Sequence, residues 1–278
     1  MRFSAPEQRA PFHKVDSRHF NLLVAQNVLP LWARFVHEGD EMNAWREMYL
    51  NSFAEAKSGA DVFLALAVAV RELGFEHCSF GIRLPLPINN PQFSLHSDYP
   101  DGWVERYVSH NYFAIDPTVG HGLTQSLPLI WQADSHRQSI EFWEEAAHYG
   151  LRYGWCMPVV GRAGAIGLVT MVRSGEPIEE RELAEKGYRM SWLATAVNGA
   201  MSGYLLKQMV PEYAAVLTPR ERETLTWSAA GKTYTEIGKI MTVDDRTVKF
   251  HLANVMRKLN ASNKTEAAAK AALLGLLL

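Results

Sequence analysis

The chain has 278 residues and a formal net charge of −2 at pH 7; 47% of its residues are hydrophobic and 21% are charged. This composition is typical of an ordinary globular protein with one or two domains. We find no run of about 18 apolar residues and no basic stretch followed by an apolar core. We therefore expect a cytoplasmic protein with neither a transmembrane helix nor a secretory signal.

Residues 1–207 predict helices that cover a sheet. Residues 1–41 are irregular and are treated as an N-terminal extension. Amphipathic helices are expected at residues 43–58, 60–73, 139–149 and 177–207. Strands are expected at residues 77–86, 92–98, 127–132, 152–160 and 165–173. The mixture predicts an α+β fold class, with an N-terminal α/β/α sandwich built on an antiparallel sheet.

Large aromatic side chains gather around one acid between residues 99 and 117. Tyr99, Trp103 and Tyr107 are spaced i, i+4, i+8 and would share one face of a helix. Asp116 and Pro117 follow shortly afterwards. Three large side chains that carry N–H or O–H donors favour a surface that holds a polar ligand. The alternatives are a core aromatic role for these rings and a turn or helix cap for Asp116.

The C-terminal segment differs in charge from the rest of the chain. Residues 218–278 contain ten Lys and Arg against six Asp and Glu, a net of +4, and the remaining residues have a net of −6. Thr218 with Glu221 forms a capping box ahead of a helix that ends near Gly231. Further helices are expected at residues 234–241 and 245–259 and after Thr265. The segment predicts an all-α domain of four helices.

The third of these helices has two different sides. Val248, Leu252, Val255 and Leu259 form its apolar stripe. Its polar side carries Arg246, Thr247, Lys249, Asn254 and Arg257. Such side chains on the second helix of a helix-turn-helix suit phosphates and base edges. A plain helical bundle with a polar face is the alternative.

The chain resembles the LuxR family of quorum-sensing transcription regulators. LTPRE, GKTYTEIGKIM and DRTVKFHLANVMRKL are similar to its GerE-type helix-turn-helix. The family's recurrent residues in both halves match Trp103, Tyr107, Asp116, Trp131, Gly154, Glu221, Leu225 and Gly231. The resemblance covers about residues 42–278. Asp244 and Asp245 replace the usual Ser-Glu, and Ala253 stands where some relatives have a basic base contact, which shifts base readout to Lys249.

The resemblance implies an N-acyl homoserine lactone as the signal ligand and no cofactor. Asp116 would accept a hydrogen bond from the ligand's amide N–H, and the Trp103 indole N–H would donate to the lactone carbonyl. Tyr99 would donate to the amide carbonyl. Tyr107 and Trp131 would wall the acyl chain and the lactone ring.

Two small polar residues complete the implied ligand site. Cys156 and Thr170 lie where relatives place such residues near the acyl chain. Two alternatives are open for the Thr170 hydroxyl: a hydrogen bond to a 3-oxo or 3-hydroxy group of the ligand, or a hydrogen bond to the backbone of its own strand.

The implied partner is double-stranded DNA, bound by a homodimer. A dimer would place two recognition helices about 34 Å apart on a pseudo-palindromic promoter site. Thr233, Arg246, Thr247 and Lys264 are candidate phosphate contacts, and Lys249 is the candidate base contact. Asn254 and Arg257 belong to the same polar side. RNA polymerase is a further candidate partner.

The resulting division is an N-terminal extension at residues 1–41, an autoinducer-binding domain at 42–207, a linker at 208–217 and a helix-turn-helix domain at 218–278. One alternative is an orphan regulator that responds to a different signal or to none. An enzyme that acts on acyl lactones or esters is disfavoured, because the chain has no GxSxG, HxxE or HxH motif and no plausible Ser-His-Asp set.

Overall fold

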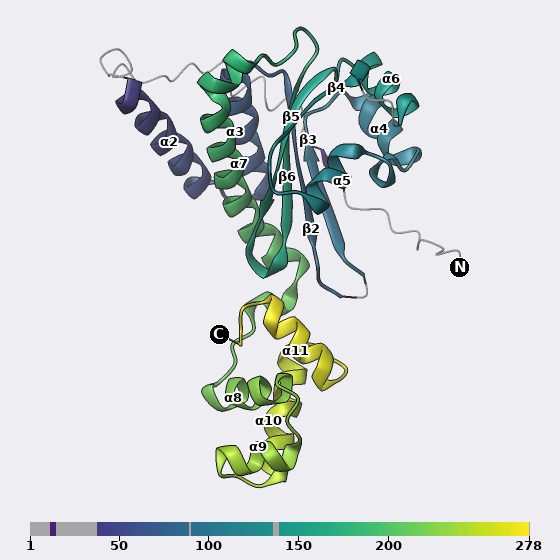
Figure 1. Ribbon diagram of the computed structural model, residues 1–278. Helices are drawn as coiled ribbons and strands as arrows, with labels where there is room; N and C mark the ends of the chain where they lie inside the picture. The colour runs from purple at the N-terminus through teal and green to yellow at the C-terminus, as the bar shows by residue number, and fades with distance from the viewer. Residues whose placement is uncertain (1–11, 15–37, 89, 136–138, 278) are drawn as a thin grey trace. The chain divides into compact units, whose positions relative to one another are not determined.

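The computed structural model describes residues 12–14, 38–88, 90–135 and 139–277 (Figure 1). The strands are β1 Phe12–Lys14, β2 His77–Leu84, β3 Gln92–Ser97, β4 Leu129–Gln132, β5 Tyr153–Val160 and β6 Ile166–Arg173. The helices are α2 Glu38–Glu55, α3 Gly59–Glu72, α4 Asp101–Ser109, α5 Pro117–Thr124, α6 Ile140–His148, α7 Glu180–Met209, α8 Pro219–Ala229, α9 Tyr234–Met241, α10 Asp245–Lys258 and α11 Lys264–Leu273.

The chain divides into two compact units. The second unit holds residues 205–278 together with the short segments 84–92 and 162–165. The first unit contains the sheet, whose strand order is β1-β3-β2-β6-β5-β4. The β2–β6, β6–β5 and β5–β4 pairs are antiparallel. Helices α3 and α7 lie on one side of this sheet and α4, α5 and α6 on the other (Figure 1), so the predicted antiparallel α/β/α sandwich is confirmed.

The structure adds elements that the sequence patterns did not predict. Strand β1 pairs in parallel with β3 at the sheet edge, although it comes from the segment that we expected to be irregular. Helix α5 begins directly after Asp116, whose side chain accepts a hydrogen bond from the Thr118 N–H as an N-cap. Helix α4 begins at Asp101, so Tyr99 lies ahead of the helix and not on it.

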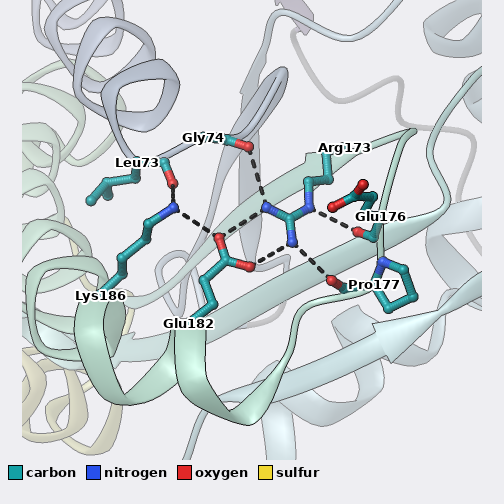
Figure 2. Close-up of polar contacts among 7 residues, drawn as sticks. All are labelled: Leu73, Gly74, Arg173, Glu176, Pro177, Glu182 and Lys186. Atoms are coloured by element: carbon teal, nitrogen blue, oxygen red, sulfur yellow. Dashed lines mark hydrogen bonds and ion pairs between the residues drawn. The ribbon is translucent and has the colours of Figure 1, made fainter.

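A network of charges fixes the start of α7 against β6 and the end of α3 (Figure 2). The Arg173 guanidinium donates to both carboxylate oxygens of Glu182, at 2.9 and 2.6 Å, and to the Glu176 and Pro177 carbonyl oxygens. The Lys186 ammonium donates to Glu182 at 2.9 Å and to the Leu73 carbonyl oxygen at 2.8 Å. Because the Arg173 and Glu182 side chains are only 13% and 17% exposed, solvent screens this pair weakly.

Replacing Glu182 with glutamine is expected to lower the free energy of unfolding by about 2 kcal/mol at pH 7, because a neutral amide leaves Arg173 without its counter-charge. The hydrogen bonds from Arg173 lower the pKa of Glu182. Its contribution is therefore present above the unfolded value of about 4.3 and is lost as the pH falls through the lower folded value. Urea unfolding at several pH values measures both effects.

Glu185→Gln is the matched control for that measurement. Glu185 pairs with Arg181 on the same helix, but both side chains are exposed, at 58% and 88%. A change below about 0.5 kcal/mol is expected there. Equal effects of the two substitutions would contradict the role assigned to Glu182.

The second unit is built from helices whose starts are fixed by their own residues. Thr218 and Thr233 each form a capping box with the glutamate three residues later, and these precede α8 and α9. Asp244 caps α10 through the Thr247 N–H. The predicted apolar stripe of α10 is buried in the core shared by α8 to α11. The four-helix prediction for this segment is confirmed.

Candidate functional site

Aromatic rings from α4, α6 and β4 form one buried cluster on the face of the sheet that carries α5. Trp103 is 3% exposed, and its ring centroid lies 5.6 Å from that of Phe142 on α6. Trp131 on β4 lies 4.9 Å from Trp143 on α6, again between ring centroids. Arg106 on α4 also donates through its Nε to Glu145 on α6 at 2.6 Å, which holds the two helices together. The rings therefore belong to a fixed wall.

Asp116 lies at the edge of this wall and accepts hydrogen bonds from several donors. The Thr118 N–H and hydroxyl donate to Oδ1 at 2.8 and 2.7 Å, and the Tyr107 hydroxyl donates to Oδ2 at 2.9 Å. Burial raises the pKa of Asp116, although these hydrogen bonds oppose the rise. The Val119 N–H also donates to this carboxylate, so backbone and side-chain donors both favour its charged form.

Tyr99 reaches the same region from the turn after β3. Its hydroxyl lies 3.2 Å from the Ser79 hydroxyl on β2, and either group can be the donor. Burial raises the pKa of Tyr99, so the phenol stays protonated and able to donate. Ser79 is a further candidate site residue, which the sequence patterns did not indicate. Its only sequence signal was a small polar residue within a buried strand.

Trp131 occupies its place because Gly154 has no side chain. The two residues pair across β4 and β5, and a Cβ atom at Gly154 would collide with the Trp131 ring. The Trp131 indole N–H is buried and has no acceptor among the described residues. A buried donor without a partner costs about 1–3 kcal/mol, so an acceptor on a bound ligand would offset that cost.

Replacing Gly154 with alanine is expected to lower the thermal midpoint by several degrees, because displacing the Trp131 ring costs about 1–3 kcal/mol. Gly175→Ala is the control, since no described atom lies within 4 Å of the Cβ added there. Differential scanning calorimetry measures both variants. A Gly154→Ala protein as stable as the Gly175→Ala protein would show that Trp131 does not depend on this close approach.

Cys156 and Thr170 lie side by side on the same face of the sheet. They are direct partners across β5 and β6, and Thr170 is in turn the partner of Ser79 on β2. Cys156 is fully buried and Thr170 is 5% exposed. All seven predicted ligand residues thus come from elements that meet on this face.

Five of the predicted DNA-binding residues lie on α10, and the other two, Thr233 and Lys264, lie outside it. Arg246, Lys249 and Arg257 are exposed on α10, whereas Thr247 and Asn254 are half-buried. The Thr233 hydroxyl is exposed and donates to Glu236 at 2.8 Å within its capping box. Lys264 is exposed at the start of α11.

An aromatic ring brings two of these lysines together. The Nζ atoms of Lys249 and Lys264 lie 5.6 and 5.3 Å from the Tyr234 ring centroid, so both lysines make cation–π contacts with α9. Phe250, 62% exposed on α10, joins the same exposed side. An exposed phenylalanine on a recognition helix can contact a thymine methyl group. Tyr234 and Phe250 were not predicted as DNA contacts from the sequence, because the predicted contacts all have polar side chains.

Two family models match this chain. "Autoinducer binding domain" matches residues 58–201, and "Bacterial regulatory proteins, luxR family" matches residues 215–271. The chain is 39% identical over 227 residues to the transcriptional activator protein SolR of Ralstonia nicotianae, which covers 82% of this chain and 96% of SolR.

Solved structures are similar to both parts of the chain. A crystal structure of Escherichia coli SdiA matches with a TM-score of 0.73 and 30% identity, covering 85% of this chain and 99% of that chain. A structure of SdiA in complex with octanoyl-rac-glycerol matches with a TM-score of 0.71 and 29% identity, covering 85% and 97%. No helix in the described part of the chain has the length and apolarity needed to cross a membrane.

Proposed function

Since the chain belongs to the LuxR family of quorum-sensing transcriptional regulators, we propose that it binds an N-acyl homoserine lactone and controls promoters in response. The observation that carries the ligand proposal is Asp116, a carboxylate that lies beside a buried aromatic wall and is hydrogen-bonded to Tyr107. A lactone signal provides an amide N–H for this acceptor and an apolar chain for the wall.

Each polar group of such a ligand has a candidate partner in the site. Asp116 accepts from the amide N–H, and Tyr99 donates to the amide carbonyl with Ser79 beside it. Trp103 donates to the lactone carbonyl, and the N–H of Trp131 is a second candidate donor. Further along the ligand, Tyr107 walls the acyl chain. Cys156 and Thr170, which are paired across β5 and β6, meet the first carbons of that chain.

We propose a division of labour along the chain. Residues 42–207 bind the signal, residues 208–217 link the parts, and residues 218–278 bind DNA, with residues 1–41 as an extension. The regulator acts in the cytoplasm as a homodimer on a pseudo-palindromic site and has no enzymatic activity. Binding of the ligand to the folded state stabilises that state by mass action. RNA polymerase is its proposed partner at the promoter.

Thermal stability in the presence of acyl homoserine lactones from C4 to C14 tests the ligand proposal. We expect the thermal midpoint to rise for one range of chain lengths, together with tighter binding to a DNA site selected from a random duplex library. A folded protein that binds DNA but shifts with none of these lactones would contradict the ligand assignment and leave the regulatory function intact.

A second candidate is a regulator of the same kind with a different acyl signal. SdiA, similar over both units, has been observed with octanoyl-rac-glycerol, which has an acyl chain and no lactone. Including 1-octanoylglycerol in the same panel separates the two candidates. A shift with the glycerol ester and with no lactone would favour this second one.

A further inference from the structure

Asp98 lies directly after β3 and immediately before Tyr99, and its carboxylate connects three elements. Oδ2 accepts a hydrogen bond from Arg71 Nη2, near the end of α3, at 2.7 Å. Oδ1 accepts from the Cys78 N–H of β2, also at 2.7 Å. The carboxylate therefore joins α3, on one side of the sheet, to the turn that leads into α4 on the other side (Figure 1).

The backbone of Asp98 is held by β2 as well. Its N–H donates to the Cys78 carbonyl oxygen at 3.3 Å, and its carbonyl oxygen lies 2.9 Å from His77 Nδ1. Since a carbonyl oxygen cannot donate, the imidazole Nδ1 carries the hydrogen of this bond. The Asp98 side chain is only 16% exposed, so solvent competes weakly for its bonds. Asp98 is thus fixed through its side chain and through both of its backbone groups.

The candidate ligand contacts begin at the next residue. The Tyr99 N–H donates to the Ser97 hydroxyl at 3.1 Å, and the Tyr99 hydroxyl lies 3.2 Å from the Ser79 hydroxyl. Helix α4, which carries Trp103, begins two residues after Tyr99. Because no residue separates Asp98 from Tyr99, a displacement of Asp98 would be passed directly to the Tyr99 ring.

The strength of the bonds decides which of them fix this turn. Both bonds to the Asp98 carboxylate have an ionised acceptor, and the bond from Arg71 also has an ionised donor. Such bonds are roughly twice as strong as bonds between neutral groups, and the bonds of Tyr99 to Ser97 and Ser79 are of the neutral kind. Asp98 therefore sets the turn, while the Tyr99 hydroxyl can donate to a ligand and accept from Ser79 at the same time.

We propose that Asp98 is a positioning residue of the ligand site, which anchors the turn between β3 and α4 and thereby holds the Tyr99 hydroxyl where it donates to the amide carbonyl of the signal. Asp98 acts through Tyr99 and not by contact with the signal. The inference rests on the proposed function, because it takes Tyr99 as the donor to that carbonyl. It extends the set of residues that control signal affinity to Arg71, on the opposite side of the sheet.

A double-mutant cycle between Asp98→Asn and Tyr99→Phe tests this inference on the full chain. Isothermal titration calorimetry measures the dissociation constant of the C4 to C14 homoserine lactone that raises the wild-type thermal midpoint most. Asparagine has one acceptor oxygen, so it keeps the bond from Arg71 or the bond from Cys78 and loses the other. We expect Asp98→Asn to weaken binding about fivefold, the effect of losing one neutral hydrogen bond, and less than twofold when Tyr99 is already phenylalanine.

Two further variants separate positioning from a general effect on the fold. Arg71→Gln removes the ionic bond and leaves the bond from the Cys78 N–H in place. It is expected to weaken binding about threefold, again only while the Tyr99 hydroxyl is present. Asp61→Asn is the matched control, because Asp61 is an exposed aspartate of α3 that accepts from the Lys57 N–H at 3.0 Å. It should leave the dissociation constant unchanged in both backgrounds.

An NMR titration of His77 reports on the anchor itself. Hydrogen bonding to Asp98 raises the pKa of His77 above the usual value of about 6.5, although burial and the charge of Arg71 oppose the rise. This pKa should fall in Asp98→Asn. It should stay at the wild-type value in Tyr99→Phe, because that substitution leaves the anchor in place.

Additive effects of Asp98→Asn and Tyr99→Phe on affinity would overturn the inference and leave the proposed function standing, since Asp98 would then support the fold in general. An Asp98→Asn protein that binds as tightly as the wild type would also overturn it. If the wild type binds no acyl homoserine lactone, the proposed function fails and this inference fails with it.

Discussion

Replacing Asp116 with asparagine is expected to weaken acyl homoserine lactone binding by about 50-fold while the protein stays folded. A hydrogen bond to a charged acceptor contributes about 1.5–3 kcal/mol, and tenfold in affinity corresponds to about 1.4 kcal/mol. Asparagine is also a good N-cap. Its single carbonyl oxygen can keep both bonds from Thr118, and α5 can begin as before. The amide NH₂ then replaces Oδ2 and cannot accept from the ligand.

The same carboxyl group predicts how binding depends on pH. Burial raises the pKa of Asp116, so protonation begins above the usual value of about 3.9. Lactone affinity should fall as the pH decreases through the raised pKa, because the charged acceptor is lost. The ligand-free fold should change in the opposite direction. A buried carboxylate with a raised pKa is unfavourable at neutral pH, and this cost disappears as the group is protonated.

Titration calorimetry of wild type and Asp116→Asn from pH 7 to pH 5 measures these effects. The asparagine variant should bind weakly with little dependence on pH. Glu105→Gln, an exposed acid on α4, is the control and should bind as the wild type does. If Asp116→Asn binds as tightly as the wild type, Asp116 is a helix cap only and the ligand has another acceptor.

Local signals in the sequence were sufficient for the helices of the second unit. Helix α9 spans residues 234–241 as predicted, because its capping box lies within four residues and its apolar side follows the helical period. Helix α5 was missed, since Gly120 and Gly122 give its short sequence a loop-like composition. The parallel pairing of β1 with β3 joins residues about 80 positions apart, and no local pattern reports such a contact.

The candidate ligand site could be predicted only in part for the same reason. Trp103 and Trp131 were identified as site residues, and both lie in the buried aromatic cluster. Tyr99 was placed on the helix, whereas the structure puts it in the preceding turn, where the partner of its hydroxyl is Ser79 on another strand. The close approach of Gly122 on α5 to Leu168 on β6 is a property of packing and not of either segment alone.

Lys249→Ala is expected to weaken binding to the selected DNA site by about 2 kcal/mol, or about 30-fold, and to reduce sequence discrimination. Lys249 is exposed on α10, and its ammonium group lies over the Tyr234 ring. The position one helical turn later, which some relatives use for base readout, is Ala253 in this chain. Losing a base contact typically costs about 1–3 kcal/mol and relaxes specificity at one position. Fluorescence anisotropy with the selected duplex and a scrambled duplex measures both quantities.

Lys264 provides a test of the distinction between base and phosphate contacts, because its ammonium group lies over the same Tyr234 ring. Lys264→Ala removes one positive charge, as Lys249→Ala does, but a phosphate contact contributes equally to every sequence. It should therefore weaken binding to both duplexes by the same factor and reduce the salt slope by about 1. Arg220→Ala, an exposed arginine paired with Glu223 on α8, controls for loss of charge in this unit. If Lys249→Ala also weakens both duplexes equally, Lys249 contacts the backbone, and Phe250 becomes the next candidate on α10 for reading the bases.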